Sequence, residues 1–208
     1  MNNENLNPAD TLNEIKDMME RSSKFISLSG LSGIIIGILA IVTVSGYCQL
    51  YGINPFDLDY EQLKSLPLQH YRHALLAAMV LFVVSVAIAS MLTISRARRM
   101  NLQVWGMASK RLLVNMFVPL SVGTLFCLVI FQKYPDLVLP LSLVFYGMAL
   151  FNASKYTHDA IRSMGMAEML LGLLCLLFMK YHIVFWTIGF GLLHVVYGTY
   201  MYVKNEQH

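Results

Sequence analysis

The chain has 208 residues, of which 57% are hydrophobic and only 13% are charged, against roughly 25% charged residues in an ordinary soluble domain. This composition argues against a soluble globular domain and favours a membrane protein with several spans. The formal net charge of +3 is too small to indicate a nucleic-acid partner.

The first 24 residues precede a long apolar run that starts at Phe25. They hold no apolar stretch of the signal-peptide kind, so we expect the first span to be retained. Thr11 and Glu14 have the spacing of a capping box, and four apolar side chains then share one helix face: Leu12, Ile15, Met18 and Met19. We predict a cytoplasmic amphipathic helix within residues 1–24, lying on the membrane or docking a partner.

Six segments approach the length of about 20 apolar residues with which a helix crosses a bilayer. They lie at about 25–48, 73–94, 112–132, 137–154, 166–181 and 183–203. The predicted fold is therefore all-α, a polytopic membrane bundle of six transmembrane helices. It forms one domain over residues 25–204, followed by a short cytoplasmic tail at 205–208.

Lysine and arginine positions predict the orientation, because cytoplasmic loops carry an excess of both. With the N-terminus inside, 11 of the 15 lie on the cytoplasmic side, and only Lys64, Arg72, Lys133 and Lys180 lie outside. We therefore expect both termini to be cytoplasmic. Five of the inside positives flank Trp105 and are expected to contact anionic lipid headgroups: Arg96, Arg98, Arg99, Lys110 and Arg111.

Two stretches of the chain resemble each other. Gly123-Thr-Leu-Phe-Cys127 leads to Val144-Phe-Tyr-Gly147, and Gly172-Leu-Leu-Cys175 leads to Val195-Val-Tyr-Gly198. Each copy reads as an outgoing helix, a short turn and a returning helix, with spans one and two as a more divergent third copy. The pattern predicts three hairpins related as parallel repeats. Small residues at Ser29, Gly33, Gly37, Gly147 and Gly198 would allow close helix packing, within the chain or in a homo-oligomer.

These hairpins resemble those of the HdeD-type acid-resistance membrane proteins, which are small six-span chains. The stretches SKFISLSGLSGIIIGILAI, ASKRLL and FNASKYTHDAIRSMG, with the C-terminal hairpin, are similar to an uncharacterised family of six-span proteins in Bacteroidetes-type bacteria. The resemblances imply a multi-pass protein of the bacterial inner (plasma) membrane, and they supply no catalytic residue.

Ionisable and polar residues within the spans are the candidate functional residues, because they are costly in a bilayer. His194 falls near the middle of the sixth span, with Tyr197 a turn away and Tyr146 at similar depth in the fourth. These three either line a polar path or satisfy the histidine locally. A second group is expected at the cytoplasmic ends, where Lys155 or Arg111 would pair with Glu168: Asn115, Asn152, Lys155 and Glu168.

Neither a metal site nor a cofactor is predicted. Three histidines fall at the outer ends of spans: His70, His73 and His182. One interpretation is a shared zinc or copper site, and the other is that they are ordinary residues of the membrane interface. The three cysteines are scattered singly, without a CxxC motif. The chain contains no GxSxG, HExxH or phosphate-binding glycine loop, so it is not expected to be an enzyme.

The sequence therefore predicts a non-catalytic integral inner-membrane protein with a structural, stress-response or sensing role. The alternative is a small transporter or channel with a polar path past His194, Tyr146 and Tyr197. A transporter requires a continuous hydrated cavity, whereas an interaction protein requires a closed core.

The orientation can be tested by labelling a cysteine introduced at Gln103 in a chain whose three native cysteines are replaced by alanine. Because residues 96–111 carry five basic side chains, a membrane-impermeant maleimide should label this site only after the cytoplasmic side is opened. Labelling in intact cells would mean that the predicted topology is inverted.

Overall fold

The structure is a computed structural model that describes residues 29–56, 65–101 and 104–206. The predicted amphipathic helix within residues 1–24 lies outside these residues. The described chain contains α-helices α2 (Gly30–Tyr51), α4 (Leu68–Arg99), α5 (Met107–Phe131), α6 (Val138–Ala153), α7 (Asp159–Leu177), α8 (His182–Trp186) and α9 (His194–Glu206). A π-helix over Thr187–Leu193 joins α8 to α9, and 3-10 turns stand at Pro135–Leu137, Ser154–Tyr156 and Met179–Tyr181.

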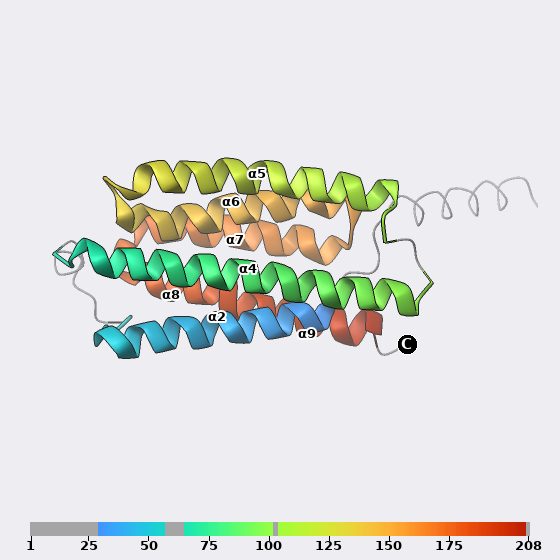
Figure 1. The fold of residues 1–208 in the computed structure, drawn as a ribbon, viewed down its shortest axis with the longest axis horizontal. Coiled ribbons are helices and arrows are strands. Elements are labelled where there is room, and N and C mark those ends of the chain that lie inside the picture. Colours follow the sequence, from blue (N-terminus) through green and yellow to red (C-terminus); the bar gives the residue numbers. More distant parts are fainter. Residues whose placement is uncertain (1–28, 57–64, 102–103, 207–208) are drawn as a thin grey trace, which may run out of the picture.

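Within the described residues, six helical stretches are long and apolar enough to cross a membrane: Gly30–Tyr51, Leu68–Arg99, Met107–Phe131, Pro135–Tyr156, Asp159–Leu177 and Met179–Lys204. The fold is an all-α bundle of six such helices, as the sequence predicts. In Figure 1 the long helices run side by side, and α2 and the C-terminal helix α9 occupy the side of the bundle opposite to α5. The centre of the bundle is formed by α6 and α7, which pack against each other along their length.

The fifth span differs from its predicted position. It covers Asp159–Leu177 and not 166–181, because the polar residues from Asp159 to Ser163 form the first turns of the helix. His158 precedes the helix with an extended backbone, and Asp159 places an acidic side chain in the first turn, where the helix dipole favours it. Glu168 consequently lies at the middle of the span and not at its cytoplasmic end.

Glycines bring α2 and the C-terminal span into backbone contact. A Cβ atom added to Gly37 would lie 2.6 Å from the carbonyl oxygen of Gly191, and one added to Gly33 would lie 3.0 Å from the Cα of Gly198. Gly147 of α6 approaches Gly165 of α7 in the same way, since a Cβ atom added to Gly147 would lie 2.7 Å from the carbonyl oxygen of Gly165. The four glycines singled out in the sequence, Gly33, Gly37, Gly147 and Gly198, therefore face helices of the same chain.

Replacing Gly37 by alanine should destabilise the protein by about 1–3 kcal/mol, because the new methyl group would overlap the Gly191 carbonyl and Val195. Gly46 lies in the same helix with nothing within 4 Å of an added Cβ. Gly46→Ala is therefore the matched control and should be neutral or slightly stabilising. Thermal unfolding in detergent measures both, and equal effects of the two substitutions would contradict the α2–α9 packing.

Candidate functional site

A buried polar group lies between α6, α7 and the C-terminal span. The Tyr146 hydroxyl is 2.7 Å from Nε2 of His194, and Nδ1 of His194 is 3.1 Å from the carbonyl oxygen of Gly189. Because a carbonyl only accepts, Nδ1 carries the imidazole proton and Nε2 accepts from the tyrosine hydroxyl. The histidine is thus held at both nitrogens, and only 6% of it is exposed.

Glu168 of α7 completes this group. Its Oε1 lies 3.8 Å from Nδ1 of His194, which is beyond hydrogen-bond distance. The glutamate is 0% exposed, and within the described residues neither carboxyl oxygen has a hydrogen-bond partner. A buried polar group without a partner is rare in folded proteins and calls for an explanation.

The π-helix Thr187–Leu193 positions the ring of His194 and leaves room for the carboxyl group of Glu168. Its i to i+5 hydrogen-bond pattern is rare and occurs frequently at functional sites. Here His194 follows the π-helix directly, and its ring bonds to Gly189 five residues earlier. Gly189 also makes room for the acid, since a Cβ atom there would lie 2.5 Å from Oε2 of Glu168. One N–H group of His194 therefore has two acceptors nearby, the Gly189 carbonyl and the Glu168 carboxyl group.

Aromatic rings enclose the group on one side. Phe190 lies between three of them, with ring centroids 4.9 Å from Tyr146, 4.7 Å from Trp186 and 5.9 Å from His194. The Trp186 indole N–H donates to the Ser142 hydroxyl at 3.1 Å. The indole N–H of Trp186 and the hydroxyl of Tyr146 therefore both have hydrogen-bond partners. Among the described residues, Glu168 is the member of this group that lacks one.

The structure brings together only part of the predicted polar path. Both tyrosines pack against an apolar cluster that includes Leu150, Ile161 and Met201, but it is the hydroxyl of Tyr146 that lies at hydrogen-bond distance from His194. The polar chain therefore does not continue through Tyr197 towards the cytoplasmic end.

The predicted pairing of Glu168 with Lys155 or Arg111 is wrong. Lys155 is exposed in the 3-10 turn that follows α6, and Arg111 is exposed in the first turns of α5. Asn115 bonds to the backbone carbonyl of Arg111 at 2.8 Å, and Asn152 lies half-buried near the end of α6. The reason is the earlier start of α7, which moves Glu168 away from the helix ends and towards His194.

The outer histidines do not form a metal centre. His73 Nδ1 lies 2.6 Å from the Tyr51 hydroxyl, His70 makes an edge contact with the ring of Tyr51, and His182 Nδ1 lies 2.8 Å from the Met179 carbonyl oxygen. Across residues 29–56, 65–101 and 104–206, no group of three His, Cys, Asp or Glu side chains is arranged to hold a metal ion.

Comparison of the chain with protein-family models, curated proteins and solved structures finds no match. What the structure defines is a six-helix bundle, suited by length and composition to a membrane, with a Glu–His–Tyr group in its core. The two resemblances drawn from the hairpin pattern stay predictions.

Tyr146→Phe should lower stability by about 0.6–1 kcal/mol, because it removes the hydrogen bond to His194. The equivalent tyrosine of the second repeat, Tyr197, lies in an apolar cluster and supplies the control. Tyr197→Phe should leave the unfolding temperature in detergent unchanged. A larger effect at Tyr197 than at Tyr146 would contradict the described hydrogen bond.

Proposed function

We propose that this chain is a non-catalytic integral membrane protein that senses protonation through Glu168 and His194. One observation carries the proposal: a glutamate in the middle of α7 is fully buried, has no hydrogen-bond partner among the described residues and lies against a histidine. Ionisable side chains at such depth are expensive, and their default interpretation is functional.

The chemistry of the group supports a response to protons. Among the described residues, the titratable side chains that interact with Glu168 are His194 from α9 and Tyr146 from α6. Because a single imidazole N–H lies between two acceptors, a change in the number of protons on the pair changes which acceptor it binds. Movement of His194 would in turn disturb its bond to Gly189 in the π-helix.

A route from the site to the rest of the bundle exists in the backbone. Gly191 of the π-helix packs against Gly37 and Ile41 of α2. A shift of the π-helix would therefore change the packing of α2. Packed interfaces tend to have discrete arrangements, and small shifts at a site can therefore change helix packing. We propose sensing rather than catalysis because this coupling needs no substrate at the buried group.

A second candidate is a small proton-coupled transporter, which the Tyr146–His194–Glu168 contact favours. Against it stand the closure of the site, with Glu168 0% and His194 6% exposed, and the apolar packing of Tyr197. A bacterial inner-membrane location and a role in stress response are part of the proposal, supported by the charge distribution of the loops and by the hairpin resemblance.

Fluorescence of Trp186 can test the sensing role, because its ring contacts Phe190 beside His194. The protein would carry Trp105→Phe, so that Trp186 is the single reporter, and would be reconstituted in vesicles and titrated from pH 4 to pH 9. We expect a sigmoidal change in emission in the parent that Glu168→Gln abolishes. Asp159→Asn removes an exposed acid of the same helix and should retain the change. A Glu168→Gln curve that overlays the parent would contradict the proposal.

The same vesicles separate sensing from transport. With a pH-sensitive dye inside and an imposed pH step, a sensor should admit protons no faster than protein-free vesicles do. Proton entry that requires Glu168 would instead favour the transporter.

A further inference from the structure

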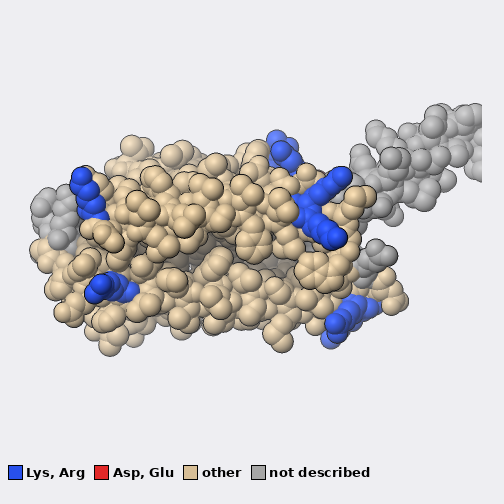
Figure 2. Space-filling view, turned by 45° about the horizontal axis from the view of Figure 1, so that its top comes forward, with Lys and Arg blue, Asp and Glu red and all other residues tan. Residues whose placement is uncertain are grey.

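The space between α4 and α5 forms a lateral groove on the bundle. α4 packs along α2 and reaches the core through Leu81, and no comparable packing joins α4 to α5 in the described chain. In Figure 1, α6 and α7 are visible between these two helices, and Figure 2 shows the face hollowed along its middle. The most apolar 18-residue window of α4 has none of its residues buried.

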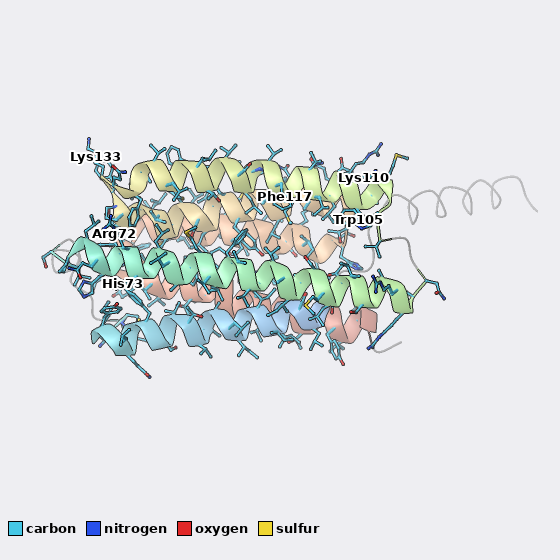
Figure 3. The ribbon with its side chains drawn as sticks, in the orientation of Figure 1. Arg72, His73, Trp105, Lys110, Phe117 and Lys133 are labelled. Atoms are coloured by element: carbon cyan, nitrogen blue, oxygen red, sulfur yellow. The ribbon has the colours of Figure 1, made fainter. Side chains whose placement is uncertain are left out.

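The walls of this groove are apolar. Phe117 of α5 is 51% exposed and lies on the side of α5 that faces α4 (Figure 3). α4 borders the other side of the groove, and the exposed surface of this helix is also rich in large apolar side chains, among them Phe82. An occupant of such a groove must itself be apolar along most of its length.

The end of the groove where α4 stops and α5 starts is basic. Lys110 lies at this end of α5, next to Trp105, which is 70% exposed (Figure 3). The last turn of α4 adds Arg98 and Arg99, which are also exposed. Figure 2 shows lysine and arginine but no acidic side chain on this face. The opposite end carries two exposed basic side chains, Arg72 and Lys133, against the three at this end. An occupant should therefore place its negative charge at the end beside Lys110.

These two requirements define an amphiphile with an anionic head. We propose that the groove between α4 and α5 binds one anionic phospholipid, with its phosphate at Lys110 and an acyl chain along Phe117. Lys110 and Phe117 are seven residues apart, or about 10 Å along a helix, which places Phe117 beneath the headgroup region. Trp105 stands where an indole ring contacts headgroups.

A transmembrane helix of a partner fits the groove less well. Helix pairs in membranes approach through small residues, and several glycines of this chain are used inside it, where α2 meets α9 and α6 meets α7. The groove presents Phe117 instead, and its basic end calls for a charge that an apolar helix lacks. The opposite end carries Arg72 and Lys133 (Figure 3), which provide the internal control.

The test counts lipids bound to the purified full-length protein by native mass spectrometry. Delipidated protein in detergent is titrated with dioleoyl phosphatidylglycerol or with dioleoyl phosphatidylcholine, which has the same chains but a neutral head. We expect one phosphatidylglycerol to bind with preference over phosphatidylcholine. Lys110→Gln should weaken its binding about five-fold, the effect of one basic side chain near a membrane surface. Phe117→Ala should weaken binding of both lipids.

Lys133→Gln is the matched control at the other end of the groove, and it should leave binding unchanged. Equal binding of the two lipids would overturn the proposal, and so would equal losses for Lys110→Gln and Lys133→Gln. Inorganic phosphate that competes with phosphatidylglycerol supports the proposal if Phe117→Ala still weakens lipid binding. If Phe117→Ala leaves lipid binding unchanged, the protein recognises only the charge, and the groove assignment is overturned. A stoichiometric protein adduct that displaces the lipid would assign the groove to a partner instead.

Discussion

Backbone contact at glycine is the constraint on which this bundle depends. Inside a bilayer no hydrophobic force draws helices together, so they associate through close packing and hydrogen bonds. Gly37 and Gly33 admit the C-terminal span to the surface of α2, and Gly147 with Gly165 joins α6 to α7. Gly189 then leaves space for the carboxyl group of Glu168 between α7 and the π-helix. A side chain at any of these positions would separate the helices that enclose the polar group.

The close approach of α7 to the π-helix also explains why Glu168 has so few polar partners. Its carboxyl group lies against Gly189, and its nearest recorded polar contact among the described residues is His194 Nδ1, at 3.8 Å. A purely structural acid would be expected to gain hydrogen bonds in return for its desolvation. The arrangement therefore fits a group that must change its bonding, and the π-helix beside it supplies a backbone with uncommon geometry at the place where that change would act.

The sequence predicted the class of fold, the number of spans and the candidate status of His194, Tyr146 and Glu168, because long apolar runs and buried ionisable residues are local signals. It did not predict the contact between Glu168 and His194. The polar residues from Asp159 to Ser163 read as a loop, although Asp159 in the first turn of α7 was a usable sign of a helix start. The π-helix also changes the angular register before His194, so a regular α-helical projection cannot tell which neighbours the ring faces.

Infrared difference spectroscopy of the reconstituted protein tests the Glu168–His194 contact most directly, since carboxyl and imidazole groups absorb at separate frequencies. Spectra recorded across a pH titration should show a carboxyl change and an imidazole change that occur together. Both should be lost from the difference spectrum, or shifted in midpoint, when Glu168 is replaced by glutamine. An imidazole change with the same midpoint in Glu168→Gln as in the parent would show that the two groups are not coupled, and would contradict the proposed role of this site.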